Sequence, residues 1–470
     1  MVFSPKNLIN KEGSFSFVGG VNAFANSCLD KKVIGELWHG FTFHLSTLKV
    51  TRTDGCVFSI GPAKPLSLDG SSYSINVEKE GVCIAAKGEK DLIMGFMTLI
   101  DRIYAEDESG NTVLKIDCCE IREAPLIQNR MVHFCIFPET EFWELARFVR
   151  LCGALKYSHI VLEFWGMLKY DCMGELAWKH AFTKEQIRPI IEEAKDLGLE
   201  VIPMFNHWGH ASAGRVRHGK HVVLDQNPGL QTYFSDDGWC WNIESQKVKT
   251  LLANVRKELV ELCGDGEYFH IGCDEAYNFD LTKTEKMDAM CDYLNEIAAQ
   301  MEKIGRKIIV WGDMFLYKYP SYEKDNRYAC NSPSPECEKY MLERLDKSII
   351  IADWQYDAIK YPVETAQVFT KAGFKTLICP WDKGVNQLAS CLDTAKNDGL
   401  FGVIHTTWHT LSVGMPYVTM AAVGCFEDSI RHKTKNVWCT ATATLLRKVY
   451  FVDGDYEKSG WAKKQIGIIT

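Results

Sequence analysis

The sequence predicts an α/β protein: a (β/α)8 TIM barrel preceded by a small α+β domain. From about Asn129 onward, short apolar strands alternate with amphipathic helices, and eight such strands occur before the chain ends. No phosphate-binding glycine motif follows the first of these strands, which disfavours a doubly wound nucleotide-binding sheet. We therefore expect an N-terminal α+β domain over 1–122 and a barrel with a C-terminal helical extension over 123–470.

The N-terminal segment shows mixed periodicity. Alternating apolar residues predict a strand over 73–77, and a second strand over 82–85 follows the turn at Gly81. Apolar residues at helical spacing predict a helix over 90–104, and another strand is expected over 112–116. Nothing in this segment suggests chemistry.

The barrel segment contains strands, helices and one long insertion. The expected strands are 130–135, 159–164, 200–205, 268–272, 307–311, 349–353, 374–379 and 401–406. Helical patterns between them include 141–152, 184–197, 247–262, 281–304 and 362–372. The insertion, 206–242, follows the third strand and is rich in His, Gly, Trp and Asp. A connection of that length in a compact domain usually forms part of a binding site.

Composition excludes several classes of partner. With 61 acidic and 53 basic residues the net charge is -8, and no basic run offers a surface for nucleic acid or an anionic membrane. No apolar stretch has the length of a signal peptide or a membrane span, so we expect a cytoplasmic protein. Its 18 cysteines include no Cys-x-x-Cys pair, which favours reduced, mostly buried thiols.

Tryptophans recur where the predicted strands end, which is where a barrel of this type builds its active site. Those at strand ends are Trp165, Trp208, Trp311, Trp354, Trp381 and Trp408. Trp239 and Trp241 lie in the long insertion. Indole faces stack on the C–H surfaces of sugar rings, so the set favours a carbohydrate ligand over an ordinary bulky rim.

Two adjacent carboxylates, Asp274 and Glu275, follow the fourth strand. Burial beside aromatic rings can keep one carboxyl protonated near neutral pH while its neighbour stays ionised. That division of labour suits acid-catalysed cleavage of a glycosidic bond. A solvated pair of loop carboxylates is the alternative interpretation of the same two residues.

The segment 270–275, His-Ile-Gly-Cys-Asp-Glu, resembles the His-x-Gly-x-Asp-Glu signature of glycoside hydrolase family 20, the β-N-acetylhexosaminidases. Residues 201–211 resemble the third-strand segment of that family, which ends in Gly-His-Ala or Gly-His-Ser; Asn206 stands where aspartate is common. Residues 31–120 resemble the family's small preceding domain. The unexported form is most similar to hexosaminidase D-like members.

The resemblance implies a retaining exo-β-N-acetylhexosaminidase that removes terminal β-linked GlcNAc or GalNAc. Asp274 would orient the substrate's 2-acetamido carbonyl as the nucleophile, and Glu275 would act first as general acid and then as base. The expected substrate-binding residues are Arg130, Glu163, Asn206, His210, Trp311, Trp354, Tyr356, Trp381 and Trp408.

Two positions depart from the family pattern. Pro380-Trp381-Asp382 stands where a seventh-strand tyrosine is usual, and Tyr356 is our substitute for it. Trp408-His409-Thr410 stands where Trp-x-Glu is usual, so an acidic contact to the outer sugar hydroxyls is missing there. Preference between gluco and galacto substrates therefore stays open.

Histidines at strand ends raise the alternative of a metal site. His207, His210, His405 and His409 lie there, but the first strand carries only His133 and no His-x-His pair. We expect neither a metal nor a cofactor. His210 would instead bind hydroxyls, support the site from behind or be structural.

Two other functions stay open. A conventional two-carboxylate β-glycosidase would use Glu275 as acid with Glu163, Asp313 or Asp353 as nucleophile. Asp313 and Asp353 could otherwise be sugar ligands or structural carboxylates. A catalytically silent carbohydrate-binding barrel is the third hypothesis. The expected partner is a glycan or glycoconjugate, and the oligomeric state is open, a homodimer being one alternative.

Overall fold

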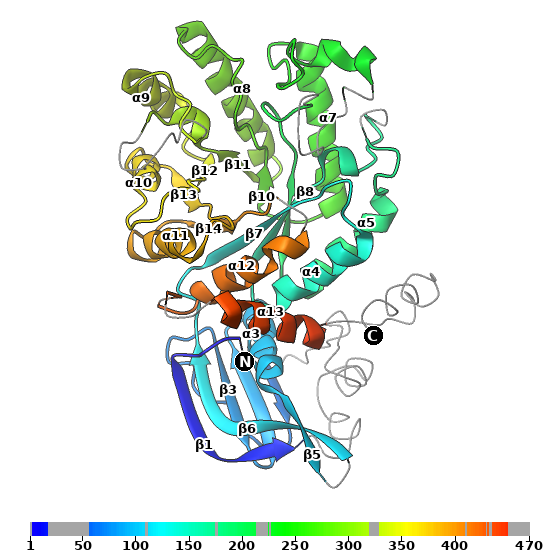
Figure 1. The fold of residues 1–470 in the computed structure, drawn as a ribbon, viewed down its shortest axis with the longest axis vertical. Coiled ribbons are helices and arrows are strands. Elements are labelled where there is room, and N and C mark those ends of the chain that lie inside the picture. Colours follow the sequence, from blue (N-terminus) through cyan, green and yellow to red (C-terminus); the bar gives the residue numbers. More distant parts are fainter. Residues whose placement is uncertain are drawn as a thin grey trace.

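The protein contains an N-terminal antiparallel sheet and a closed parallel barrel, stacked along the long axis of the molecule (Figure 1). The computed structural model describes residues 2–16, 56–108, 111–173, 177–212, 224, 227–318, 329–408, 411–428, 430–431 and 435–449. The predicted fold class, a (β/α)8 barrel preceded by α+β structure, is confirmed. The division at residues 122 and 123 into two domains stays a prediction.

The N-terminal sheet has the order β1-β6-β3-β4-β2, with β5 also paired to β6. Its strands are β1 Asn7–Ser16, β2 Val57–Ile60, β3 Tyr73–Glu78, β4 Gly81–Ala86, β5 Tyr104–Glu108 and β6 Asn111–Glu123. Helix α3, Glu89–Arg102, packs on β3 and β4 and also meets the first helix of the barrel. The sequence patterns identified β3, β4 and α3 and part of β6, but not β1, β2 or β5.

Eight parallel strands close the barrel in the order β10-β11-β12-β13-β14-β7-β8-β9. They are β7 Asn129–Cys135, β8 His159–Glu163, β9 Glu200–Met204, β10 Tyr268–His270, β11 Lys307–Trp311, β12 Ile350–Asp353, β13 Lys375–Ile378 and β14 Gly402–His405. The ring closes where β14 pairs with β7 and where His270 of β10 pairs with Met204 of β9. All eight predicted strands are present, each within two residues of its expected ends.

Helices surround the barrel (Figure 1). They are α4 Phe142–Ala154, α5 Lys184–Asp196, α7 Gln246–Cys263, α8 Thr284–Glu302, α9 Pro335–Arg344, α10 Glu364–Lys371, α11 Val385–Asn397, α12 Leu411–Gly424 and α13 Lys435–Val449. Local sequence fixes the start of helix α5. Thr183 and Gln186 form a reciprocal capping box that satisfies free N–H groups there. Among the described residues, no helix is long and apolar enough to cross a membrane.

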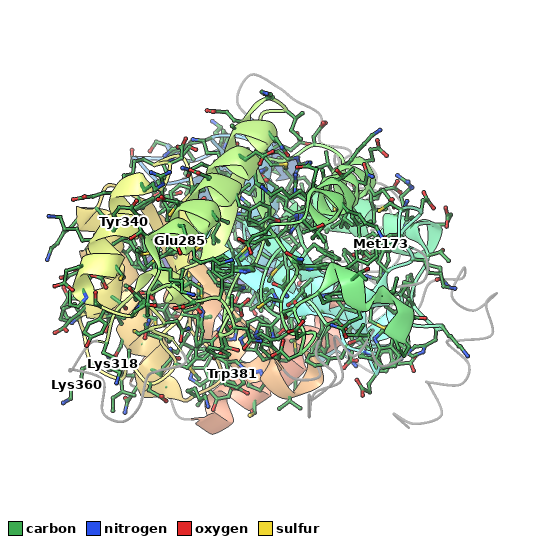
Figure 2. All side chains as sticks on the ribbon, turned by 90° about the horizontal axis from the view of Figure 1, so that it is seen from above. Met173, Glu285, Lys318, Tyr340, Lys360 and Trp381 are labelled. Atoms are coloured by element: carbon green, nitrogen blue, oxygen red, sulfur yellow. The ribbon has the colours of Figure 1, made fainter. Side chains whose placement is uncertain are left out.

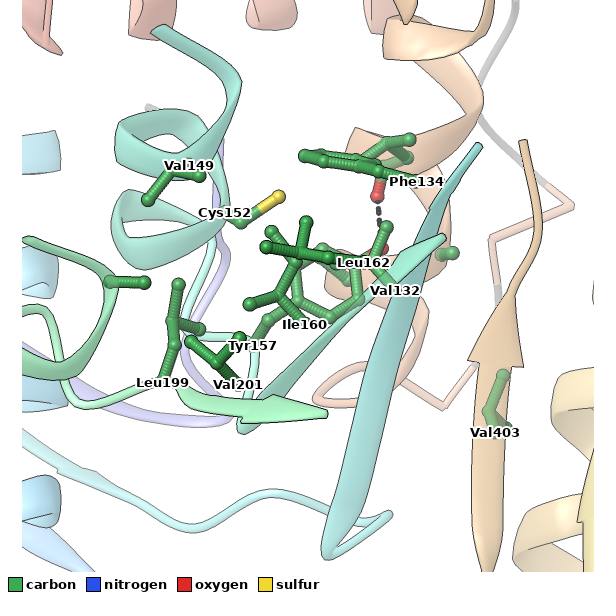
Figure 3. Packing of buried hydrophobic residues seen from close by; sticks show 14 of the residues in the cluster. Val132, Phe134, Val149, Cys152, Tyr157, Ile160, Leu162, Leu199, Val201 and Val403 are labelled. Carbon is green, nitrogen blue, oxygen red and sulfur yellow. Dashed lines mark hydrogen bonds between the residues drawn. The ribbon is translucent and has the colours of Figure 1, made fainter. Parts of the chain in front are cut away.

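Successive residues of the barrel strands point alternately into two hydrophobic layers. On β8, Val161 belongs to the barrel interior, whereas Ile160 and Leu162 belong to the layer between strands and helices. Figure 3 shows Ile160 and Leu162 facing Val149 and Cys152 of α4. Burying a side chain of this kind stabilises a fold by about 1.5–3 kcal/mol, so the alternation fixes the strand register.

The cysteines agree with the expectation of reduced thiols. Every cysteine in the described ranges is free, and most are buried within the two hydrophobic layers or beneath the strand ends.

Candidate active site

The backbone after β10 turns sharply and carries the two adjacent carboxylates. Gly272, Cys273 and Glu275 have φ of 66°, 76° and 53°, so β10 ends at His270, two residues earlier than predicted. A non-glycine residue in this region costs on the order of 1–3 kcal/mol, and such strain persists only where the surroundings impose it. Asp274 and Glu275 are therefore held in place by their neighbours.

Two close approaches require glycine at this turn. A Cβ on Gly272 would lie 1.8 Å from the Asn206 side-chain oxygen, and one on Gly209 would lie 1.8 Å from the Asp274 carbonyl. Both distances are far below contact, so the loop after β9 can pack against the loop after β10 only without these side chains. The glycines in the two signature segments thus fix how closely the loops approach.

His210 links the two carboxylates. Its Nε2 lies 2.9 Å from Glu275 Oε2 and 3.3 Å from Asp274 Oδ2. The side chains of His210, Asp274 and Glu275 are 20%, 8% and 18% exposed, so this trio is recessed but open to solvent. The sequence placed all three residues at strand ends, and the structure brings them into contact.

Electrostatics favour a charged imidazole in the trio. Burial alone would lower the pKa of His210, but the charges of Asp274 and Glu275 and its hydrogen bonds to them outweigh burial and raise this pKa to about 10. At neutral pH His210 is therefore an imidazolium shared by the side chains of Asp274 and Glu275. The cation offsets the repulsion that would otherwise separate the adjacent acids.

Asp313, two residues after the end of β11, supports the turn that carries Glu275 by hydrogen bonds. Its Oδ2 accepts hydrogen bonds from the Glu275 backbone N–H and from Asn331 Nδ2, both at 2.9 Å. Its Oδ1 accepts one from the indole N–H of Trp354 at 3.1 Å. Burial and the nearby Asp274 charge raise the pKa of Asp313 well above its usual range. Asp313 is 1% exposed, and its three acceptor contacts position Glu275 and Trp354.

Four predicted aromatic residues line one side of the site. Trp408 donates from Nε1 to the Tyr356 hydroxyl at 2.6 Å, and the ring of Tyr356 packs on Trp354 at 5.2 Å and on Trp381 at 5.1 Å. All four are half-buried, and Tyr356 is close enough to Asp274 for that charge to raise its pKa, although burial contributes more. The structure thus gathers an aromatic wall from three successive strand ends.

Three predicted sugar contacts lie beneath the site instead of on its surface. Trp311 is fully buried and packs on His270, whose ring centroid is 4.3 Å away. Glu163 and Asn206 are each 1% exposed and are joined by a hydrogen bond of 2.9 Å, and Glu163 also hydrogen-bonds His133 at 3.0 Å. We therefore correct their expected role from sugar ligand to support of the site floor.

The prediction for Arg130 is wrong. This residue lies at the amino end of β7, where its guanidinium donates to the backbone oxygens of Lys156, Ile127 and Gln128. The carboxyl ends of the parallel strands carry the trio, so Arg130 is at the opposite end of the barrel. The expectation rested on the resemblance to a first-strand arginine of the family, and in this chain Arg130 lies at the opening of that strand.

The remaining candidate residues are either buried or lie outside the described part of the chain. Trp165, Trp208 and Trp241 are each at most 1% exposed and pack in the core, so they offer no sugar surface. Asp353 is fully buried, and its oxygens accept from Gln355 and Thr365. His409 lies outside the described residues. Within those residues, no three His, Cys, Asp or Glu side chains group as metal ligands.

Sequence reasoning missed two aromatic contacts to Glu275. Trp239 donates from its indole N–H to the Glu275 carbonyl at 2.6 Å and packs on the His210 ring at 4.5 Å. Tyr277 stacks on Trp239, two residues beyond Glu275. The long insertion signalled a binding site, but nothing in its sequence shows which tryptophan reaches back to the β10 turn.

The closed parallel barrel thus presents an Asp–Glu pair, a shared histidine and an aromatic wall at its carboxyl strand ends. Residues 162–385 match the family model of the glycosyl hydrolase family 20 catalytic domain. The chain is thus similar to glycoside hydrolase family 20 over the part of the barrel that carries the trio.

The chain is also similar to curated relatives and to solved structures. The chain is 22% identical over 360 residues to the β-hexosaminidase subunit beta of Entamoeba histolytica, covering 73% of this chain and 61% of that one. It is 27% identical over 134 residues to hexosaminidase D of Bos taurus, covering 28% and 36%. The chain thus spans less than two thirds of the length of these relatives.

Among solved structures, a GH20 exo-β-N-acetylglucosaminidase from Vibrio harveyi superposes with a TM-score of 0.64 at 15% identity, covering 96% of this chain and 78% of that one. An N-acetyl-β-hexosaminidase from Streptomyces plicatus gives a TM-score of 0.56 at 16% identity, with coverage of 85% and 82%. At these identities the likeness establishes the shared fold.

Proposed function

We propose that the chain is a retaining exo-β-N-acetylhexosaminidase that removes terminal β-linked GlcNAc or GalNAc, using the substrate's own 2-acetamido group as nucleophile. The observation that carries this proposal is the contrast between one solvent-open acidic trio and three buried carboxylates around it. Asp274 and Glu275 share His210 at the open end of the barrel. Glu163, Asp313 and Asp353 are each at most 1% exposed.

This contrast disfavours a protein nucleophile. A carboxylate that attacks the anomeric carbon must reach the sugar, about 5 Å from the acid. Glu163 and Asp313 are occupied by hydrogen bonds to Asn206 and to the Glu275 backbone, and Asp353 is held by Thr365 and Gln355. An internal acetamido carbonyl needs no such residue and gains from proximity.

Each member of the trio has a separate task in the proposed reaction. Asp274 accepts a hydrogen bond from the acetamido N–H, which turns the carbonyl oxygen toward the anomeric carbon and stabilises the positive oxazolinium that forms. Glu275 gives its proton to the departing glycosidic oxygen as the C–O bond breaks. It then takes a proton from the water that opens the oxazolinium, so the product retains its configuration.

His210 is a positioning residue in this scheme. As an imidazolium it pairs with Asp274 and anchors the Glu275 carboxyl by the 2.9 Å hydrogen bond. Trp239 and Asp313 fix the Glu275 carbonyl and amide, so both side chain and backbone of the acid are held. Preorganisation of this kind lets the acid act without rearrangement.

The aromatic wall would receive the terminal sugar. Trp354, Tyr356, Trp381 and Trp408 present half-buried rings that suit the apolar faces of a pyranose. The Tyr356 hydroxyl, which already accepts from Trp408 and meets Thr406, is the group we assign to the acetamido oxygen in place of the family tyrosine.

The test compares three nitrophenyl substrates: the β-N-acetylglucosaminide, the β-N-acetylgalactosaminide and the plain β-glucoside. We expect the two acetamido sugars alone to be cleaved, and Glu275→Gln and Asp274→Asn to lose most activity, on the order of 100-fold or more. Glu285→Gln is the matched control, because Glu285 is exposed on α8 and lies well away from Trp381 in Figure 2.

Each alternative outcome has a definite meaning. Equal turnover of the plain glucoside, or full activity of Asp274→Asn, would exclude the acetamido nucleophile. Sugar binding without any turnover would identify a silent carbohydrate-binding barrel. The ratio of the two acetamido rates defines the gluco or galacto preference.

We also propose a cytoplasmic location. The cysteines of the described ranges are free thiols, mostly buried, which is usual for proteins of reducing compartments. Fractionation of cells that express the full chain would test this location, and recovery in the secreted fraction would contradict it.

A further inference from the structure

A run of stacked rings leads outward from the trio. The ring centroids of His210 and Trp239 are 4.5 Å apart. Trp239 and Tyr277 follow at 6.3 Å, with their planes only 16° apart. Tyr277 ends the run and is 48% exposed. We call Trp239 and Tyr277 the aromatic platform.

Single exposed tyrosines are common on protein surfaces, but Tyr277 lies directly beside the proposed acid. Its backbone N–H bonds to the Glu275 carbonyl at 2.8 Å, and the same carbonyl accepts from Trp239. The Tyr277 backbone and the Trp239 indole are therefore both bonded to the backbone carbonyl of the proposed acid. One side of the Tyr277 ring rests on Trp239, and the ring is open to solvent beyond it.

An open cavity of about 560 Å³ lies against Tyr277. Its other walls include Tyr317, Asn331 and Ser332, and Lys318 stands at its outer side, near the periphery of the molecule in Figure 2. Asn331 also donates to Asp313, which holds the Glu275 backbone. Asn331 therefore belongs both to the cavity wall and to the hydrogen bonds that position the acid. The volume of the cavity is that of a small-ligand site.

We propose that the platform and this cavity bind the leaving-group sugar of a β-linked oligosaccharide. The inference rests on the proposed function and adds the part of the substrate beyond the cleaved bond. Glu275 protonates the oxygen that joins the two sugars, so the departing ring must lie next to Glu275 on its solvent side. Tyr277 is the aromatic residue placed there.

The chemistry of the cavity fits a pyranose ring. The Tyr277 face suits the C–H surface of a sugar, while Asn331, Ser332 and the Tyr317 hydroxyl offer polar contacts to its hydroxyls. Because the cavity is open, a longer glycan can continue into solvent beyond the second ring.

The test uses two substrates that differ only in the leaving group: N,N'-diacetylchitobiose, which has a leaving sugar, and N-acetyl-β-glucosaminyl fluoride, which has none. The quantity measured is the ratio of kcat/KM for the disaccharide to kcat/KM for the fluoride. We expect Tyr277→Ala to lower this ratio about tenfold, the size of one lost ring stack.

Two further variants separate stacking from other effects. Tyr277→Phe keeps the ring and should retain most of the ratio. Tyr104→Ala is the matched control, because Tyr104 is a similarly exposed tyrosine on β5 of the N-terminal sheet, and its ratio should stay at the wild-type value.

The outcomes distinguish this inference from the proposed function. If the wild type cleaves neither substrate, the proposed function fails. If the wild type cleaves both but Tyr277→Ala leaves the ratio unchanged, or slows both substrates equally, then the platform is not a leaving-group site and the inference is overturned.

Discussion

Lys156 and His210 both pair with carboxylates, but in surroundings that differ in exposure and charge balance. Lys156, just after α4, lies between the barrel and the N-terminal sheet; its amine is 2.6 Å from Glu123 and within 3.2 Å of Tyr73 and Thr98 oxygens. Its side chain is fully buried and that of Glu123 is 6% exposed. In the trio, by contrast, one imidazolium serves two carboxylates that stay partly open to solvent.

The Lys156 cluster is closed in every direction. Three hydrogen-bond acceptors match the three amine protons, and the rings of Phe3 and Phe426 lie 3.6 and 4.2 Å from the nitrogen. Burial lowers the pKa of Lys156, while Glu123 opposes that shift. Because one cation is paired with one carboxylate, the pair has no excess charge for a ligand to neutralise.

Exposure and charge balance distinguish a structural charged residue from a functional one. Burial and ionic contact are common to both clusters, so neither identifies an active site. Surplus carboxylate and partial exposure occur at the trio and not at the Lys156 cluster. Backbone strain does not separate the two, because Lys156 itself has φ of 61°.

The first prediction breaks the closed cluster. Lys156→Met or Glu123→Gln leaves one buried group without its partner, which should cost about 3–5 kcal/mol of unfolding free energy. The double variant should recover part of that loss. Urea unfolding of all four proteins measures the coupling, and strictly additive losses would contradict a coupled pair.

The second prediction breaks the open trio. His210→Gln removes the imidazolium and leaves two adjacent carboxylates without a shared cation. We expect kcat to fall about 100-fold because Glu275 loses its anchor. Removing the imidazolium should also lower the unfolding free energy, so kcat is measured per folded molecule. A purely structural histidine would instead give lower stability with normal kcat per folded molecule.

The third prediction tests the strained turn. Gly272→Ala would place a Cβ 1.8 Å from the Asn206 oxygen at φ of 66°, so it should cost more than the roughly 1–3 kcal/mol of backbone strain alone. Gly373→Ala is the matched control, with φ of 90° and open space around the new Cβ. Equal losses in thermal unfolding would show that the contact with Asn206 is not tight.

The fourth prediction concerns pH. The pKa of His210 is about 10 in the folded protein and about 6.5 when unfolded, so its stabilisation is fully present below pH 6.5 and is lost as pH rises toward 10. The difference in unfolding free energy between wild type and His210→Gln should shrink over that window, by at most about 1.4 kcal/mol per pH unit. A constant difference would mean that His210 is neutral.

Local patterns predicted the barrel well, because each strand and helix is short and its periodicity is set by neighbouring residues. All eight strands were found, and the Asp274–Glu275 pair was placed at the correct end of one of them. The strands β1 and β2 were missed because their pairing depends on partners far along the chain. Strand β5 was missed although β6, its hairpin partner, follows it directly. Local periodicity does not show which distant segments pair or in what register.

Site residues were harder to predict than strands. Knowing that a residue follows a strand does not show whether its side chain points to solvent or to the barrel interior, so Trp311 and Trp354 looked alike. Arg130 was misassigned because the expectation rested on a family resemblance, which does not show at which end of β7 the side chain lies. The roles of Trp239 and Asp313 depend on contacts across loops, which only the fold reveals.

The most direct test of the acetamido nucleophile is the rate of nitrophenol release from β-glucosaminides whose N-acetyl methyl group carries zero, one, two or three fluorines. Fluorine withdraws electrons from the carbonyl and weakens it as a nucleophile while leaving the departing nitrophenol unchanged. The account predicts that kcat falls steeply with each added fluorine. A kcat that does not change across the series would contradict it, because the bond would then break without help from the substrate's carbonyl.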